Sequence, residues 1–406
     1  MVRRALKGLG TILVFLLVAA CFAPTLLPPF LDRIYYRGPA SAHFDGAHFF
    51  NPDGDDTFTP PPGSGGGGAR AGFFWRYLTG DDDRPVWPEQ VAVTQSRPAR
   101  RVEGEAMVAT WVGHATFLVQ THGLNILTDP IWSDTAGPFG LGPRRVAAPG
   151  IAFDDLPPID VVLISHNHYD HMDLTTLRRL WERDRPSIVT SLGNDAILRA
   201  AGIESVALDW GEYVRVPFCP AGAECEPPWM FVHVNRNHHW GSRWFTDRNR
   251  ALWSSFVVRL QSGGNLFFAG DTGLGDGGWA DDARALGPIR LALIPNGAFR
   301  FAPGQMASGS HIGPVDAIEV ARRLGAARIL AMHWGTFRLS YEGWDTPPRL
   351  LREALRCAGA SGAPFAPVRF GAPVAIPAYS APAIARAPPR AEILRCLDRP
   401  DVRALR

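Results

Sequence analysis

The sequence has no long block of Lys or Arg and no internal repeat of solenoid length. A formal net charge of +2 over 406 residues argues against a dedicated nucleic-acid partner, because neutralising phosphates requires clustered basic residues. Only 20% of the residues are charged and 46% are hydrophobic, which excludes wholesale disorder and allows a large core. The length suits one large domain or two ordinary ones.

Cysteine is also scarce, with five in the whole chain. Besides Cys21, the chain has Cys219, Cys225, Cys357 and Cys396, an even number that would allow two disulfides. Cys219 and Cys225 bracket a short loop that could close on itself. Four unpaired thiols are an equally acceptable interpretation, because pairing cannot be read from a sequence. In either case, the cysteines are poorly placed to join the histidine cluster described below.

The N-terminus has basic residues followed by an apolar run over residues 9–23, the pattern of a secretory signal or an uncleaved membrane anchor. The run includes a Val-Ala-Ala-Cys sequence ending at Cys21, which resembles a bacterial lipoprotein cleavage site. A simple transmembrane anchor continuing to Leu27 is the alternative. We therefore expect residues 1–27 to be a signal peptide or membrane anchor. The expected location is the bacterial cell envelope, as a membrane-anchored protein or a lipoprotein facing the periplasm.

Composition divides the rest of the chain into three parts. Residues 28–101 are expected to form an N-terminal extension that contains a flexible Gly-rich linker. Residues 102–357 alternate between short apolar runs typical of strands and amphipathic stretches typical of helices. They are expected to form the catalytic domain. Residues 358–406 are rich in Ala and Pro and are expected to form a tail that wraps the surface.

Residues 102–357 predict short strands mixed with helices. A helix is expected over Pro314–Leu324, because Pro suits its first position, acidic residues come early, arginines come late and Gly325 ends it. Two more helices are expected, over residues 174–183 and 195–201. Strands are expected over residues 107–112, 117–120, 124–128, 161–165, 187–190, 230–234, 255–260, 266–269, 291–294 and 329–332. This mixture implies a layered α/β fold with function on the loops at strand ends.

The main functional motif is His166-Asn167-His168-Tyr169-Asp170-His171, directly after an apolar strand. Imidazole and carboxylate groups are good ligands for divalent ions such as Zn²⁺. His166 and His168 are two residues apart, so in an extended loop they point the same way. Asp170 and His171 follow at a turn and can face a second ion. A solvated histidine-rich loop is the alternative, but it does not explain why the motif follows a buried strand.

Three further strand ends offer potential metal ligands. Asp271 lies in a Gly-rich turn after residues 266–269, where a carboxylate can bridge two ions. His333 follows residues 329–332, and His239 follows the strand that ends near residue 234. Each residue alone is more often structural. Together with the motif, they indicate a site for two metal ions.

The motif and its flanking segments resemble one family closely. His-Xaa-His-Xaa-Asp-His after a hydrophobic strand is the signature of the metallo-β-lactamase superfamily. Over roughly residues 108–352 the sequence resembles N-acylphosphatidylethanolamine-hydrolysing phospholipase D and its bacterial relatives. The matching segments are Trp111-Val112-Gly113-His114-Ala115-Thr116, Leu127-Thr128-Asp129-Pro130, His166 to Asp173, His239-Trp240, Asp247-Arg248-Asn249, Ala251-Leu252-Trp253, Phe268-Ala269-Gly270-Asp271-Thr272-Gly273, His311 and His333-Trp334-Gly335-Thr336-Phe337.

The resemblance implies an αββα sandwich of four layers that binds two Zn²⁺ ions, although other divalent metals suit the same ligand types. One ion would be held by His166, His168 and His239. The other would be held by Asp170, His171 and His333, with Asp271 bridging the two. His238 remains an alternative to His239, because adjacent histidines cannot be separated without geometry.

Catalytic roles are expected for Asp170, Asp271 and His311. The family has a histidine at the active site at the position of His311. An imidazole beside a helix N-terminus can stabilise an anionic phosphate oxygen. A capping or surface role for His311 is the alternative.

Two further residues have open interpretations. His114 lies behind the metal ligands or is only a turn residue. Asp129 precedes Pro130, which favours a turn, but a link from Asp129 to a metal-binding histidine is the alternative.

The expected function is that of a zinc-dependent hydrolase. The resemblance implies a phospholipase-D-type phosphodiesterase that cleaves N-acylphosphatidylethanolamine-like phospholipids through a metal-bridging hydroxide, without a Ser or Cys nucleophile. A metal-dependent lactonase or a non-lipid phosphodiesterase of the same fold is one alternative. A non-enzymatic zinc-bearing envelope protein is another, but structural zinc sites are usually closed and single. The expected partners are a phospholipid or small phosphodiester substrate, a membrane surface and a second copy of the chain.

Overall fold

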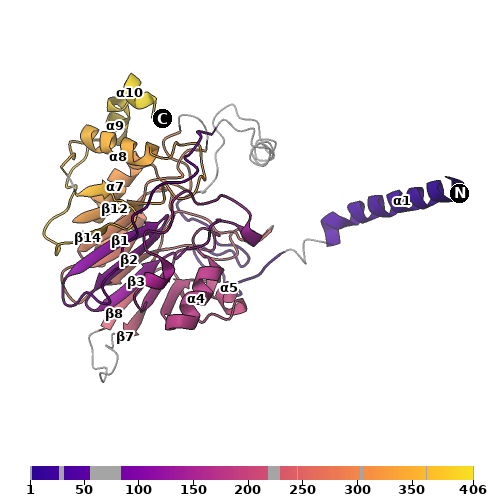
Figure 1. The fold of residues 1–406 in the computed structure, drawn as a ribbon, viewed down its shortest axis with the longest axis horizontal. Helices are drawn as coiled ribbons and strands as arrows, with labels where there is room; N and C mark the ends of the chain where they lie inside the picture. Colours follow the sequence, from indigo (N-terminus) through magenta and orange to yellow (C-terminus); the bar gives the residue numbers. More distant parts are fainter. Residues whose placement is uncertain are drawn as a thin grey trace.

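The computed structural model describes residues 2–26, 32–54, 84–217, 229–244, 246–301, 305–362 and 364–405. The Gly-rich linker, Cys219 and Cys225 lie outside these ranges. Helix α1 (Val2–Leu26) projects away from the rest of the chain (Figure 1). Among the described residues, no helix meets the length and apolarity needed to cross a membrane.

In the described part of the chain, two seven-stranded sheets pack face to face (Figure 1). The first sheet consists, in spatial order, of β14 (Pro373–Ala375), β1 (Met107–Gly113), β2 (Thr116–Thr121), β3 (Leu124–Thr128), β4 (Val161–Ile164), β5 (Ser187–Ser191) and β6 (Val206–Leu208). Strands β1 to β3 are antiparallel, whereas β3 to β6 are parallel. The carboxyl ends of β3 and β4 therefore meet at one edge, where Asp129 and His166 follow them.

The second sheet consists of β13 (Phe365–Pro367), β12 (Arg328–Met332), β11 (Ile289–Pro295), β10 (Asn265–Phe268), β9 (Ser255–Arg259), β8 (Trp229–Asn235) and β7 (Tyr213–Pro217). Strands β10 to β13 are parallel, and β9 is antiparallel to both β8 and β10. Strands β8, β10 and β12 therefore run the same way, and their carboxyl ends precede His239, Asp271 and His333.

Helices cover the outer faces of both sheets. The first sheet packs against α4 (Leu174–Asp184) and α5 (Asn194–Ala200). The second packs against α6 (Gly278–Ala285), α7 (Pro314–Leu324) and α8 (Thr346–Cys357), with α9 (Arg390–Cys396) and α10 (Pro400–Arg403) beside them. Two 3₁₀ turns, η1 (Pro138–Gly140) and η2 (Phe153–Asp155), lie in loops. The expected mixed α/β architecture with two sheets and covering helices is confirmed.

The first sheet separates two apolar cores. Along β4, Val161 and Leu163 face the core between the sheets, whereas Val162 and Ile164 face the core under α4. Side chains alternate across a strand, so a strand buried on both faces must be apolar at every position. Burying each such side chain contributes roughly 1.5–3 kcal/mol. This is why an uninterrupted apolar run immediately precedes the histidine motif.

The helix expected over Pro314–Leu324 is present with the same bounds as α7. Pro occupies its first turn, and Gly325 ends it in the left-handed conformation (φ 62°) that glycine adopts without a steric penalty. The carboxyl end of β10 lies beside the amino end of α7. Ile312, just before α7, donates a backbone hydrogen bond of 2.8 Å to the carbonyl of Thr272, just after β10.

Both terminal regions contribute to the fold. In the N-terminal extension, Phe44 and Phe49 pack against Trp253. The Ala/Pro-rich C-terminal segment supplies β13 and β14, one edge strand to each sheet. A disulfide between Cys357 and Cys396 connects α8 to α9.

Candidate metal centre

The seven expected metal ligands converge at one edge of the two-sheet sandwich. Each follows the carboxyl end of a strand, so the strand directions bring them together. They are His166, His168, Asp170 and His171 after β4, His239 after β8, Asp271 after β10 and His333 after β12. Among the described residues, His114 and His311 also belong to groups whose ligand atoms all lie within 4.8 Å of one another.

The first group consists of His166, His168 and His239. His166 Nε2 lies 2.7 Å from His168 Nδ1. The Nε2 atoms of His168 and His239 are buried and have no hydrogen-bond partner in the described part of the chain. Buried polar atoms normally have a partner. Three converging imidazoles, two of which have an unpaired nitrogen, therefore fit a bound cation such as Zn²⁺.

Burial keeps this first group neutral. It lowers the pKa of His168 to about 3, and it lowers the pKa values of His166 and His239 well below the usual 6.5. A neutral imidazole is the form that binds a metal. The first group is therefore ready to bind a cation at neutral pH without losing protons.

The second group consists of His114, Asp170, His171 and His333. His171 Nε2 and His333 Nε2 are 3.2 Å apart. His114 Nε2 lies 2.9 Å from Asp170 Oδ2. Burial opposes protonation of His333, but Asp271 and Asp170 raise its pKa to about 9. The second group therefore differs from the first in combining imidazoles with carboxylates.

Asp271 lies between the two groups. Its Oδ2 atom is 3.2 Å from His171 Nε2 and 3.0 Å from His333 Nε2. The same carboxylate belongs to a group with His239 and His311, and its Oδ1 atom is buried without a partner among the described residues. Burial opposes ionisation, but His171 and His333 hold the pKa of Asp271 well below 3.8. This is the position of a carboxylate that can face two cations at once.

The geometry distinguishes the two adjacent histidines. The ring of His239 points into the first group, and its Nδ1 donates a hydrogen bond to Ser310 O at 2.9 Å. His238 Nδ1 instead lies 2.9 Å from Asp53 Oδ1 in the N-terminal extension. His239 is therefore the one of the pair that can join the metal centre.

His311 lies beside both groups. Its ring centroid lies 5.2 Å from that of His239 and 5.6 Å from that of His333. The N-cap of α7 is Gly313, and among the described residues the helix has no side-chain cap hydrogen bond. The capping alternative for His311 is therefore wrong. Burial lowers the pKa of His311 to about 4, so this imidazole is neutral at pH 7.

The sequence left the roles of two further residues undecided, and both His114 and Asp129 contact candidate ligands. Asp129 Oδ2 accepts a hydrogen bond from His171 Nδ1 at 2.7 Å. His114 and His333 both have left-handed backbones, with φ 53° and 62°, and His333 N donates to His114 O at 3.0 Å. Such backbones are uncommon outside glycine. The conformation of this pair brings both rings to the second group.

One contact of the centre had no signal in the sequence. Asn51, in the N-terminal extension, donates a hydrogen bond from Nδ2 to His239 O at 2.8 Å. It also accepts one from Trp253 Nε1 at 3.0 Å. The extension has no helical or strand periodicity, so only the folded structure shows that it supports a candidate ligand.

Fold and site together define a metal-dependent hydrolase of the metallo-β-lactamase fold. The family described as "Beta-lactamase superfamily domain" matches residues 124–334, more than half of the chain, and the chain belongs to this family. A structure of a possible metal-dependent hydrolase from Veillonella parvula has the same fold, with a TM-score of 0.50 and 14% identity over 67% of this chain and 99% of that one.

Among its relatives, the chain is 33% identical over 252 residues to N-acyl-phosphatidylethanolamine-hydrolyzing phospholipase D 1 of Caenorhabditis elegans. That match covers 60% of this chain and 68% of the relative. The chain is also 28% identical over 234 residues to a UPF0173 metal-dependent hydrolase of Rubrobacter xylanophilus, covering 56% of this chain and 81% of the relative.

Proposed function

We propose that this protein is a two-zinc phosphodiesterase of phospholipase D type that cleaves N-acylphosphatidylethanolamine-like phospholipids. The observation that carries the proposal is the position of Asp271 between two groups of candidate ligands. The similarity to the phospholipase D of Caenorhabditis elegans supports the choice of substrate. The proposed ligands are His166, His168 and His239 for one ion and Asp170, His171 and His333 for the other, with Asp271 shared.

The ligand types support zinc. Imidazoles predominate in both groups, whereas Mg²⁺ and Ca²⁺ prefer oxygen ligands. When bound, a pair of such cations lowers the pKa of water and neutralises charge on phosphoryl oxygens. The groups lie at the ends of rigid strands, which preorganises them for one geometry.

His311 is proposed to contact the substrate phosphate. Its Nδ1 atom is buried without a partner among the described residues and lies 3.7 Å from Asp271 Oδ2. A neutral imidazole can donate a hydrogen bond from one nitrogen to a phosphoryl oxygen. The amino end of α7, which begins at Pro314, adds a favourable dipole for an anion at the same place.

Arg243 holds the histidine motif in position. Its Nη1 atom donates hydrogen bonds to Asn167 O at 3.1 Å and Met172 O at 2.9 Å, and its guanidinium lies 4.1 Å from the centroid of the Tyr169 ring. Tyr169 in turn donates to Arg243 O at 2.8 Å. These contacts bracket the segment that contains His168 and Asp170. Arg243 therefore orients candidate ligands through the backbone and the Tyr169 ring of the motif.

A location in the bacterial cell envelope is also proposed. It is supported by the basic residues and apolar run over residues 1–27. It would place the enzyme near its lipid substrate.

The test uses the purified full-length protein. Metal content is measured by mass spectrometry, and release of phosphatidic acid from N-acylphosphatidylethanolamine is followed with chelator and after zinc is restored. We expect two ions per chain and zinc-dependent hydrolysis. Asp271→Asn should lower kcat/KM at least about 100-fold, because it weakens the shared ligand. The control is Asp154→Asn, at a side chain that is 94% exposed.

Three outcomes would overturn the proposal. Hydrolysis of lactones but not phosphodiesters would identify a lactonase. Cleavage of small phosphodiesters without any cleavage of phospholipid would exclude the lipid substrate. Tight zinc binding without hydrolysis of either bond would indicate a non-enzymatic protein.

A further inference from the structure

A small hairpin projects beside the metal centre. Thr135 pairs with Arg144 in antiparallel fashion, and two backbone hydrogen bonds of 2.9 Å, Ala136 N to Pro143 O and Arg145 N to Asp134 O, hold its arms together. The tip is the 3₁₀ turn η1. We call residues 134–145 the tip hairpin.

The tip hairpin presents large apolar side chains to solvent. Phe139 is 88% exposed and Leu141 is 66% exposed. Phe139 also has a left-handed backbone (φ 56°, ψ 28°), which is unusual for an aromatic residue. Val86, on a neighbouring segment, is 93% exposed. Clustered exposed apolar side chains on a folded protein usually mark a surface that contacts something else.

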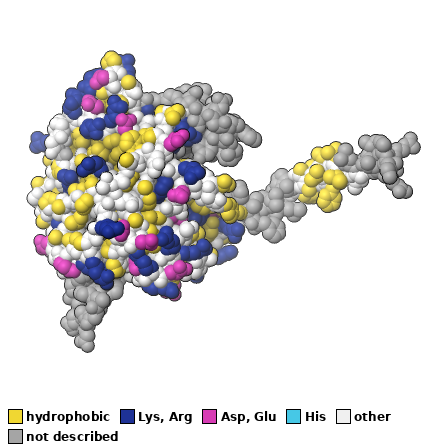
Figure 2. All heavy atoms as spheres, viewed as in Figure 1, with side chains coloured by type: hydrophobic (Ala, Val, Ile, Leu, Met, Phe, Trp, Pro, Cys, Tyr) yellow, Lys and Arg dark blue, Asp and Glu magenta, His cyan; other side chains and the backbone are white. Residues whose placement is uncertain are grey.

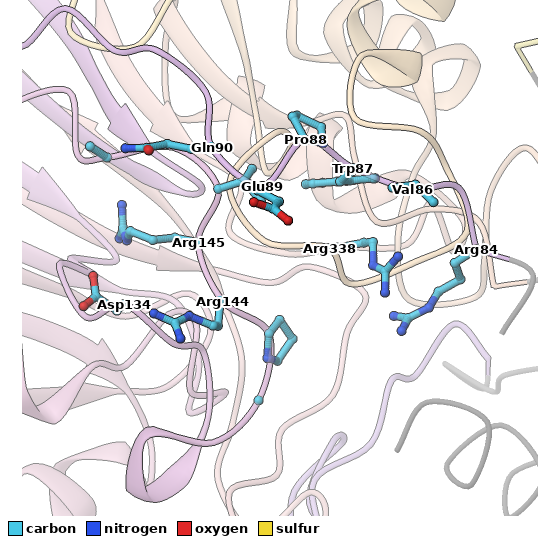
Figure 3. A pocket seen from close by; sticks show the side chains of 14 residues that line it. Arg84, Val86, Trp87, Pro88, Glu89, Gln90, Asp134, Arg144, Arg145 and Arg338 are labelled. Atoms are coloured by element: carbon cyan, nitrogen blue, oxygen red, sulfur yellow. The ribbon is translucent and has the colours of Figure 1, made fainter. Parts of the chain in front are cut away.

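Basic side chains surround these apolar residues. Arg144 lines recesses on both sides of the tip hairpin, with volumes of about 890 and 580 Å³. Figure 3 shows the larger recess, where Arg338 lies across from Arg144. Val86 lines the same recess. Glu89 and Asp134 also line the larger recess, but its four arginines outnumber them, so the surface combines an apolar tip with a base of net positive charge.

Not every arginine in this region is available for a partner. Arg145 donates hydrogen bonds to three backbone carbonyls, those of Ile131, Ser133 and Ala147, so it has a structural role. Arg144 and Arg338 are therefore the cations to assign to a partner, although Arg338 also donates a bond of 3.3 Å to Pro85 O.

We propose that the tip hairpin docks the protein on an anionic phospholipid surface. Phe139 and Leu141 enter the interfacial layer, and Arg144 and Arg338 contact lipid phosphates. An apolar tip above a cationic base matches the layers of a membrane, in which phosphates lie outside acyl chains. Two or three protruding side chains are too few for a stable protein interface, which buries about 800 Å² on each partner.

The tip hairpin lies close to the proposed metal ligands. The smaller recess is lined by Tyr169, the neighbour of Asp170. On the other side, the guanidinium of Arg145 lies 5.3 Å from the ring of Phe337, whose ring lies 5.2 Å from that of His114. Docking through the tip hairpin would therefore bring the metal centre close to the lipid surface. The docking itself does not depend on the reaction proposed above.

The experiment measures docking locally by hydrogen–deuterium exchange of the full-length protein. A local readout is needed because α1 also exposes apolar side chains (Figure 2). Phe15, for example, is 75% exposed. Vesicles of equal parts phosphatidylcholine and phosphatidylglycerol should protect amides of the tip hairpin, and salt should weaken the effect. Vesicles of phosphatidylcholine alone should protect them less.

Variants separate the two kinds of contact. Phe139→Ser with Leu141→Ser should raise the lipid concentration for half-maximal protection about tenfold, since it removes apolar burial. Arg144→Gln and Arg338→Gln should each raise it about fivefold with anionic vesicles only. Val206→Ser, at a 41% exposed apolar residue of the edge strand β6, is the matched control.

Folding of each variant is checked by its zinc content and its hydrolysis of a soluble phosphodiester or lactone, which should be unchanged. The proposal is overturned if the tip hairpin gains no protection, or if the double serine variant is protected as well as the original protein. Docking without cleavage of phospholipid would instead refute only the proposed function. Cleavage without docking would refute only this inference.

Discussion

Asp129 accepts a hydrogen bond from Nδ1 of His171 at 2.7 Å, and both side chains are completely buried. The same carboxylate accepts bonds from the backbone N and the Oγ of Ser165, at 2.7 and 2.5 Å. These contacts determine which nitrogen of His171 faces the metal centre, because Nδ1 is occupied and Nε2 points toward Asp271. Asp129 is therefore a positioning residue behind a proposed ligand.

Replacing Asp129 with Asn should loosen the orientation of His171. We expect Asp129→Asn to weaken zinc binding at the second group about 10- to 100-fold, and to leave the first group nearly unchanged. Competition with a chromogenic chelator measures both affinities. Asp154→Asn, at an exposed carboxylate, should change neither. Two unchanged affinities in Asp129→Asn would show that this hydrogen bond does not position the ligand.

Asn51 should matter for both stability and metal binding. Asn51→Ala removes the partner of His239 O and of Trp253 Nε1. Leaving such groups buried and unpaired costs roughly 1–3 kcal/mol, so the free energy of unfolding should fall by about that amount. Zinc affinity of the first group, which contains His239, should fall more than that of the second. Urea denaturation and chelator competition measure the two effects.

The variant Asn51→Asp separates these contributions. It keeps an acceptor for Trp253 Nε1 but removes the donor to His239 O. We expect it to recover part of the stability and none of the zinc affinity. Recovery of the zinc affinity would mean that Asn51 supports the fold rather than His239.

Most strands and several helices were predictable because their signals are local. Strand β4 is apolar at every position because it is buried on both faces, and α7 has recognisable residues at both ends. The seven proposed ligands also follow strand ends, so they could be found from chain order. Their proximity follows from strand direction, which the alternation of strands and helices already suggested.

Other features depend on long-range contacts that no local pattern reveals. The edge strands β13 and β14 have three residues each, too few for an alternating pattern to be visible. His114 reaches Asp170 only because its own backbone is left-handed and pairs with His333. Asn51 contacts His239 across 188 positions of the sequence. The sequence drew attention to His114 but left its role open, and it gave no signal for Asn51, because both contacts depend on how the two sheets assemble.

The disulfide between Cys357 and Cys396 should stabilise the C-terminal segment. The two residues are 39 positions apart, so the bond restricts a long loop in the unfolded chain. We expect Cys357→Ser to lower the free energy of unfolding by about 2–4 kcal/mol, and zinc binding to persist at low denaturant. Urea denaturation with and without reductant is the measurement. Cys21→Ser, which removes an unpaired cysteine, should have no effect.

The two metal groups should differ in the protons that they release. Burial keeps the pKa of His168 at about 3, so the first group is already neutral at pH 7. In the second group burial opposes protonation, but nearby carboxylates raise the pKa of His333 to about 9 and that of His171 well above 6.5. These two imidazoles are therefore protonated at pH 7 before metal binds, and must lose protons to become ligands.

Zinc affinity of the second group should consequently rise with pH up to about 9, because the proton competes with the metal below the raised pKa. Affinity of the first group should stay nearly constant from pH 9 down to pH values approaching the lowered pKa of His168. Calorimetric titration at pH 7 in buffers of different ionisation heat counts the released protons. Asp271→Asn should reduce the number released, since the carboxylate that raises the pKa of His333 loses its charge. Equal proton release by both groups would contradict this assignment of charge within the centre.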